Sequence, residues 1–135
     1  MAKEKIISSW GTRKRAIARA TVKPGTGVVR INSKLLQLYQ PALARMKIEE
    51  PLLLAEGLKD AVNISINVRG SGIMSQADAA RMAIATGLVL FSKDKKLEDT
   101  YLEYDRHLLV ADTRRAESSK PNNSKPRHKR QKSYR

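Results

Sequence analysis

Residues 61–92, AVNISINVRGSGIMSQADAARMAIATGLVLFS, constrain the fold more than any other stretch of the chain. The first part alternates apolar and polar residues, which predicts a strand with one buried face. Its apolar residues are Val62, Ile64, Ile66 and Val68. Apolar residues then recur at helical spacing, which predicts a long core helix. They are Ala77, Ala80, Ile84, Leu88 and Phe91. The sequence therefore predicts a strand, a tight turn and a core helix in direct succession.

Helices are also predicted on both sides of this unit. Ser75, with Asp78 three residues later, resembles a capping box at the start of the long helix. A shorter helix is expected at 93–104. In residues 33–58 we expect two short helices, because Pro41 and Pro51 each suit a first helical turn and Gly57 suits a helix end.

A β-hairpin is predicted from Arg13 to Asn32. Residues 12–23 alternate, with one small apolar face and one cationic face. The apolar face holds Ala16, Ala18, Ala20 and Val22, and the other holds Arg13, Arg15, Ile17, Arg19, Thr21 and Lys23. The sequence PGTG at 24–27 favours a turn, and VVRIN after it has strand character.

The C-terminal part of the chain has a different character. Residues 118–135 contain seven basic residues, no acidic residue and almost nothing apolar. Such a segment buries too little apolar surface to offset the entropy lost on ordering, so we expect it to be disordered in isolation. The chain is therefore divided into a globular domain at 1–104 and a basic C-terminal arm and tail at 105–135, in which 106–117 form an arm that docks on the domain.

The charge balance points to a polyanionic partner. The 135 residues include 27 Lys and Arg against 13 Asp and Glu, a net charge of +14. This favours nucleic acid as the partner. Cysteine is absent, so disulfides and cysteine-ligated zinc are excluded. Apolar runs are too short for a membrane span, and MAKEKIISSW lacks the apolar core of a signal peptide, so a cytosolic location without membrane contact is expected.

An enzymatic function has little support in the residues. His107 and His128 lack metal-ligand spacing, and we expect neither a metal nor a cofactor. The scattered acidic residues are interpreted as solvated helix and loop surface; they are Glu49, Glu50, Asp60, Asp94, Glu98, Asp99 and Glu103. In GSGIMS, Ser75 replaces the third glycine of a dinucleotide fingerprint. The same turn has two remaining interpretations, a purely structural turn or an anion site for an RNA phosphate flanked by Arg69 and Arg81.

The cationic strand also favours RNA. Arg13, Lys14, Arg15 and Arg19 have no acidic neighbour in the sequence between Glu4 and Glu49, so we expect an external anion beside them. One Trp, one Phe and four Tyr are too few to indicate a base-stacking platform. Recognition of phosphates and of folded RNA shape fits better.

Four motifs and the C-terminal sequence resemble the family of small ribosomal subunit protein nine, in its archaeal or eukaryotic form. They are GTRKRAIARATVKPGTG with RIN, VRGSGIMSQADAARMAIA, DTRRAE and the final QKSYR. They occur in family order between Gly11 and Arg135. Ser118 and Ser119, followed by KPNNSKP, stand where many relatives have two lysines and then glycines. The short chain and the KPNNSKP stretch favour the archaeal form.

The resemblance implies a fold and a location. The fold is a single compact α+β domain, a β-sheet packed with helices and containing a left-handed β-α-β crossover, followed by a long basic extended C-terminal tail. The location is the head of the small subunit, with ribosomal RNA, peptidyl-site tRNA and neighbouring ribosomal proteins as partners.

The resemblance also implies two sets of binding residues. Ribosomal RNA would be contacted by Arg13, Lys14, Arg15, Arg19, Arg69, Gly70, Ser71, Gly72, Gln76, Arg81, Arg114 and Arg115. The tRNA anticodon stem-loop would be approached by Lys129, Arg130, Lys132, Ser133, Tyr134 and Arg135.

Two other functions compete with this one. A free-standing RNA chaperone would explain the charge but not the ordered motifs, and it would not stay with the small subunit after a salt wash. An RNA-processing enzyme would need a catalytic constellation, and the sequence offers none.

Overall fold

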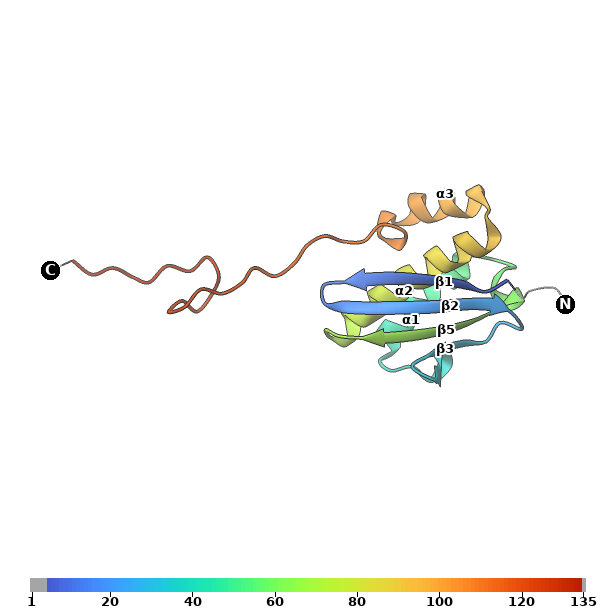
Figure 1. Cartoon of the computed structure of the whole chain (residues 1–135), viewed down its shortest axis with the longest axis horizontal. Helices are drawn as coiled ribbons and strands as arrows, with labels where there is room; N and C mark the ends of the chain where they lie inside the picture. Colours follow the sequence, from blue (N-terminus) through green and yellow to red (C-terminus); the bar gives the residue numbers. More distant parts are fainter. Residues whose placement is uncertain (1–4, 135) are drawn as a thin grey trace.

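A five-stranded mixed sheet is the framework of the fold, in a computed structural model that describes residues 5–134 (Figure 1). The strands are β1 (Ile7–Arg13), β2 (Ala16–Pro24), β3 (Val29–Ile31), β4 (Lys34–Leu35) and β5 (Val62–Arg69). Their order in the sheet is β1-β2-β5-β3-β4. Helices α1 (Ala42–Leu54) and α2 (Ile73–Ser92) cover one face of the sheet, and α3 (Lys95–Tyr104) lies beyond the β1 edge (Figure 1).

The predicted hairpin from Arg13 to Asn32 is wrong. β2 pairs with β1 through a turn at Lys14 and Arg15, and its other edge pairs antiparallel with β5 from Ile17 to Pro24. β3 lies on the far side of β5 and runs parallel to it. The chain does turn after Pro24, but β5 offers β2 a ladder of eight residue pairs, whereas β3 has only three residues. The longer ladder therefore takes the central place in the sheet.

Two further predictions, both about helices, are wrong. A single helix, α1, replaces the two expected short ones, and Pro51 lies inside it while Pro41 is its N-cap. Pro51 is buried, so its packing in the core offsets the helix hydrogen bond that it cannot donate. Helix α2 begins at Ile73 with Gly72 as N-cap, so Ser75 lies inside the helix and forms no capping box. The predicted helix at 93–104 is confirmed as α3.

The core forms where the alternating faces meet α2. The four apolar residues predicted on each of β2 and β5 are all buried. Small residues let α2 lie directly on the sheet: a Cβ added at Gly11 would lie 2.2 Å from the Ala79 carbonyl oxygen. The Ser9 hydroxyl donates to the Ala83 carbonyl at 2.7 Å, so this buried polar side chain is satisfied.

The end of the domain is fastened by α3 and the residues after it. The buried Tyr101 hydroxyl donates to the carbonyl of Pro51 at 2.7 Å, which ties α3 to α1. Burial raises the pKa of Tyr101 far above its ordinary value, so the phenol remains a donor. The short 3-10 helix η3 (Arg106–Leu108) follows, and Leu108 is fully buried. The first part of the arm is therefore docked on the domain.

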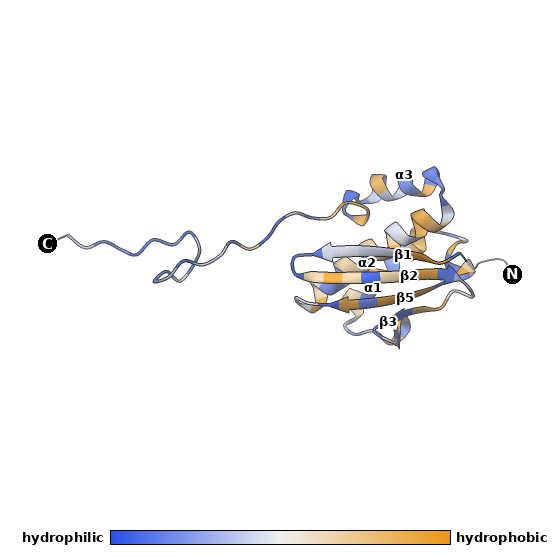
Figure 2. Cartoon of the chain, in the orientation of Figure 1, coloured by the Kyte–Doolittle hydropathy of each residue, from blue (hydrophilic) through white to orange (hydrophobic). Residues whose placement is uncertain are grey.

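From Leu109 to Tyr134 the chain has no helix or strand. In Figure 1 it leads away from the domain, and Figure 2 shows it mainly in hydrophilic colours. No helix within residues 5–134 is long and apolar enough to cross a membrane.

Candidate nucleic-acid interface

Two turns that are far apart in the sequence touch at one end of the sheet. One is the β1–β2 turn with Lys14 and Arg15, and the other is the β5–α2 turn at residues 70–72. A Cβ added at Gly70 would lie 2.4 Å from the Arg15 carbonyl oxygen, and Gly70 has a φ of 85°. Both facts require glycine at this position. The Gln76 side chain fixes the turn further by donating to the Gly70 carbonyl at 3.1 Å.

The arm completes a cationic cleft beside these turns. The cleft has a volume of about 570 Å³. It is lined by Arg13, Lys14, Arg15, Ser71, Arg114, Arg115 and Ala116. Five of these residues are basic and none is acidic, so the cleft is suited to an anion such as a phosphate. Six of them are among the residues predicted to contact ribosomal RNA, and three separate segments supply them.

Arg13 forms ion pairs with carboxylates of its own chain, whereas the sequence predicted an external anion beside it. Its guanidinium lies 2.7 Å from Asp112 and 3.7 Å from Asp78. Asp112 is 99 positions away in the sequence, which is why no acidic neighbour was visible there. The prediction of an external anion therefore stands only for Lys14, Arg15 and Arg19.

Asp112 holds the arm in place. Its carboxylate accepts hydrogen bonds from the Arg114 side chain and from the Arg114 backbone N–H, in addition to the ion pair with Arg13. These hydrogen bonds, together with the two positive charges, hold the pKa of Asp112 far below its ordinary value. Arg115 donates to the Asp112 carbonyl at 2.9 Å. Arg114 and Arg115 of the arm are thereby directed to the cleft.

Arg81 lies in a second ion-pair cluster and not on the open surface. Its side chain is 12% exposed and lies 2.6 Å from Glu50 and 2.8 Å from Asp105. Burial opposes the charged form of Asp105, but the hydrogen bond from the His107 backbone and the pairing with Arg81 outweigh it, so the pKa of Asp105 is lowered. Glu50 is thus an ion-pair partner, although the sequence placed it among solvated surface residues.

A second cationic surface lies on the side of the sheet that α1 and α2 leave uncovered (Figure 1). We call it the open face. Its side chains are those of Ser8, Trp10, Thr12, Ile17, Arg19, Thr21, Lys23, Arg30, Asn63, Ser65, Asn67 and Arg69. Four are basic and none is acidic. Arg19 and Arg69, both predicted to contact RNA, lie here and not in the cleft.

The predicted tRNA-binding residues lie far along the extension. Lys129, Arg130, Lys132, Ser133 and Tyr134 are all exposed. Arg135 lies outside the described residues. An ion pair of 2.5 Å between Arg127 and Glu117 joins the middle of the extension to its beginning.

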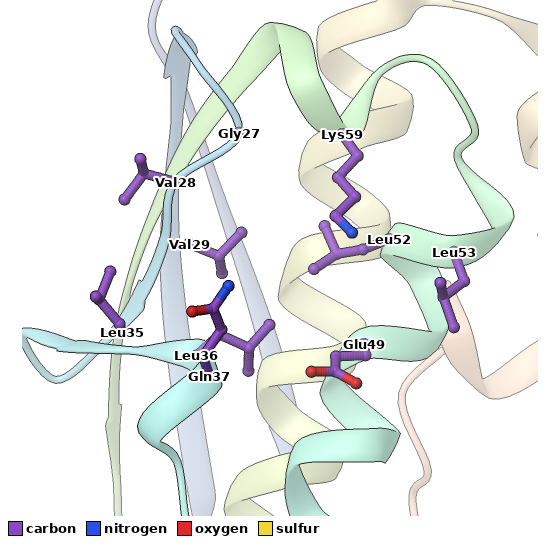
Figure 3. Close-up of a pocket in the computed structure, with 10 residues that line it drawn as sticks. All are labelled: Gly27, Val28, Val29, Leu35, Leu36, Gln37, Glu49, Leu52, Leu53 and Lys59. Atoms are coloured by element: carbon purple, nitrogen blue, oxygen red, sulfur yellow. The ribbon is translucent and has the colours of Figure 1, made fainter.

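The structure also has an apolar cleft, which is separate from the two cationic surfaces. It lies between β3, β4 and α1, has a volume of about 430 Å³, and is lined mainly by apolar side chains (Figure 3). Leu35, Leu36, Leu52 and Leu53 surround it, with Glu49 and Lys59 at its rim (Figure 3). With one charge of each sign, this cleft does not favour a polyanion.

Three residues of the interface escaped the sequence analysis. Asp112 and Asp78 were not recognised as partners of Arg13, because only the fold brings them together. Trp10 is 61% exposed on the open face, although tryptophan is usually largely buried. The alternation of β1 would have indicated its side of the strand, but not that this side is uncovered.

Comparisons with known proteins agree with this geometry. The family described as ribosomal protein S9/S16 matches residues 11–135. The chain is 47% identical over 131 residues to small ribosomal subunit protein uS9 of Methanothrix thermoacetophila, a match that covers 97% of this chain and 99% of that protein. The chain therefore belongs to the ribosomal protein S9 family, whose members are structural, non-enzymatic proteins of the small ribosomal subunit in the cytoplasm.

Proposed function

We propose that this protein is a structural constituent of the small ribosomal subunit that binds ribosomal RNA in the subunit head and extends its C-terminal tail to the peptidyl-tRNA site. Family membership supports the first part of this proposal. The observation that carries the RNA-binding assignment is the cleft in which five basic residues from three segments converge without an acidic lining residue.

The cleft favours the RNA backbone over base edges. Arginine forks and backbone N–H groups bind phosphate oxygens well, and such contacts fix position without reading sequence. Ser71 adds a hydroxyl, and no side chain caps the N-terminus of α2 beside it. A phosphate in the cleft would therefore meet both side-chain cations and a helix N-terminus. Gly70 and Gln76 shape this turn and Gly72 is the N-cap of α2, whereas Arg81 ties α2 to Glu50 and Asp105.

The tail is proposed to follow a channel in the RNA. Its charges neutralise phosphates where RNA helices crowd together, and the segment becomes ordered on assembly. Pro121 and Pro126 favour an extended backbone. At about 3.3 Å per residue, the last eighteen residues would span roughly 60 Å. Lys129, Arg130, Lys132, Ser133, Tyr134 and Arg135 would then meet the anticodon stem-loop of any tRNA, because backbone contacts carry no base information.

Two details of the architecture belong to the same proposal. We divide the chain functionally into an RNA-anchoring domain at 1–104 and an arm and tail at 105–135. We also propose that the connection from β3 through α1 to β5 has the left-handed geometry that the family resemblance implies. The parallel pairing of β3 with β5 supports a crossover there. An experimental structure of the assembled subunit tests both details.

Neighbouring ribosomal proteins are proposed to contact the side of α1 and β4 away from the cationic surfaces. The apolar cleft of Figure 3 lies there with Leu53 in its lining, and Leu38, Leu43 and Leu53 of residues 38–53 are each more than 60% exposed. Apolar surface of this kind is typical of protein contacts.

The cleft assignment is tested by replacing Lys14 and Arg15 together with serine. We expect the variant to bind a small-subunit RNA fragment roughly tenfold more weakly at low salt, with a smaller dependence of affinity on salt. Its free energy of unfolding should be unchanged, because both side chains are exposed. The matched control is the replacement of Lys95 and Lys96, two exposed lysines of α3, by serine. Equal RNA affinity for the two variants would contradict the assignment.

A further inference from the structure

We propose that the open face of the sheet holds an unpaired RNA nucleotide, with its base stacked on Trp10. This inference rests on the proposed RNA-binding function and adds a base contact to it. The sequence composition had argued against a stacking platform, because aromatic residues are few. Only the position of Trp10 in the fold changes that conclusion.

Trp10 is presented to solvent by a rigid strand. Its neighbours in β1, Ser9 and Gly11, are buried against α2, so the indole must extend from the opposite face. There it is 61% exposed, and β1 is an edge strand of the sheet. A large aromatic ring held by a sheet loses little entropy on binding, which suits a stacking contact.

The residues paired across the sheet from Trp10 are suited to bind the phosphate and the base edge of the same nucleotide. Arg19 is its direct cross-strand partner, and Asn67 is the partner of Arg19 on β5. Directly paired positions bring side chains within contact of one another. The row Trp10–Arg19–Asn67 therefore combines a stacking ring, a cation for a phosphate and an amide able to hydrogen-bond a base edge.

The surrounding surface continues this pattern along the sheet. A hollow of about 290 Å³ beside Arg19 and Asn67 includes Arg69, and another of about 380 Å³ includes Lys23 and Arg30. Each hollow has two cations. The absence of any acidic side chain from the open face favours a polyanion over a protein partner with mixed charges. Adjacent strands lie about 4.8 Å apart, so the row from β1 to β5 has the width of roughly one nucleotide.

The fluorescence of Trp10 gives a direct test, because it is the only tryptophan in the chain. The full-length protein is titrated at low salt with single-stranded oligoadenylate of twelve nucleotides and, separately, with inorganic polyphosphate of similar charge. Binding is followed in parallel by competition against a labelled oligonucleotide. We expect oligoadenylate to quench Trp10 strongly and polyphosphate to bind without comparable quenching, since only the first has bases to stack.

Two substitutions complete the experiment. Trp10→Ala should weaken oligoadenylate binding by about 5- to 100-fold, whereas Trp10→Phe should largely retain it. Leu43→Ala, which removes an equally exposed apolar side chain from α1, is the matched control and should have no effect. Polyphosphate binding should not change in any of these variants.

The outcomes separate this inference from the function on which it rests. Oligoadenylate binding without quenching, or equal quenching by the two ligands, would overturn the stacking contact and leave RNA binding intact. If the fluorescence of Trp10 is quenched only by other proteins of the small subunit, Trp10 belongs to a protein interface and the stacking contact is overturned. Failure of the protein to bind RNA at low salt would contradict the proposed function itself.

Discussion

The domain and the tail carry the same net charge but hold it in different ways. Residues 118–135 have seven basic and no acidic residues, and residues 1–117 have the remaining 20 basic and 13 acidic residues, so each part has a net charge of +7. In the domain, Arg13 and Arg81 reach carboxylates on other elements. In the tail, the six basic side chains that the structure describes are exposed.

This difference separates two uses of a cation. A paired arginine inside a fold fixes elements relative to one another, and its removal leaves carboxylates without a partner. An exposed cation on a segment without secondary structure contributes mainly by releasing counterions when it meets phosphate. Sequence motifs alone assign both kinds to RNA, and the structure distinguishes them.

The largest effect is expected from breaking the Arg81 cluster. Arg81→Ala should lower the free energy of unfolding by about 2 kcal/mol, somewhat less than for a fully buried pair because Glu50 and Asp105 are each about 30% exposed. Chemical denaturation followed by circular dichroism measures this change. Arg69→Ala, at an exposed arginine of the open face, is the control and should change the value by less than about 0.5 kcal/mol. Unchanged stability with weaker RNA binding would instead make Arg81 an RNA contact.

Substitutions in the tail should weaken RNA binding without lowering the stability of the domain. Replacing Lys129, Arg130 and Lys132 with alanine should leave the unfolding of the domain unchanged and weaken tRNA binding to isolated small subunits roughly tenfold at low salt. The slope of log affinity against log salt should become shallower by about 2, since three phosphate contacts are lost. Filter binding at several salt concentrations measures both quantities.

A matched variant with Lys120, Lys125 and Arg127 replaced by alanine loses the same charge from the first half of the tail. It should have a smaller effect on tRNA, because those residues lie farther from the proposed contact. Equal effects of the two triple variants would mean that the charge of the tail acts without regard to position.

The docking of the arm should depend on pH in one direction. The pKa values of Asp105 and Asp112 are lowered in the folded protein, so their contribution to stability is fully present above their ordinary pKa of about 4 and is lost as pH falls further. Amide NMR signals of residues 112–115 should therefore stay constant from pH 7 to about 5 and shift below about 4. In Asp112→Asn, the signals around residue 112 should be altered already at pH 7. Identical spectra of the two proteins at pH 7 would contradict the docking role of Asp112.

The smallest effect is expected from the ion pair within the extension. Glu117→Gln removes the partner of Arg127, and both side chains are exposed. Such pairs contribute little, so the melting temperature of the domain should not change measurably. A clear decrease in a calorimetric scan would show that the extension is more closely bound to the domain than its exposure indicates.

The sequence predicted those parts of the fold that depend on local periodicity. The buried alternation of β2 and β5, and the helical repeat of α2, are confirmed because each pattern already determines which face is buried. The partner of β2 was mispredicted, since strand order depends on competition between segments far apart in the chain. Pro51 was misplaced for a similar reason: the tertiary packing of a buried proline overrides its local preference.

The sequence predicted which basic residues belong to the candidate site, but not which acidic residues lie beside them in the fold. The motifs contained Arg13, Arg15 and Arg81 as predicted RNA contacts. The carboxylates that pair with Arg13 and Arg81 come from other elements; they are Asp112, Asp78, Glu50 and Asp105. Only the folded structure shows that Arg13 and Arg81 have these internal partners, whereas Arg15 lines the cleft. The exposure of Trp10 likewise depends on the helices covering one side of the sheet alone.

We propose that the domain anchors the protein on ribosomal RNA while the end of the tail reaches peptidyl-site tRNA. Crosslinking mass spectrometry on native small subunits carrying peptidyl-site tRNA examines both contacts in one experiment. We expect adducts between ribosomal RNA and the peptides containing Lys14 or Arg115, and adducts between the tRNA anticodon stem-loop and peptides from residues 127–135. Adducts of the tail to ribosomal RNA alone would contradict the tRNA contact and leave the tail with a role in assembly only.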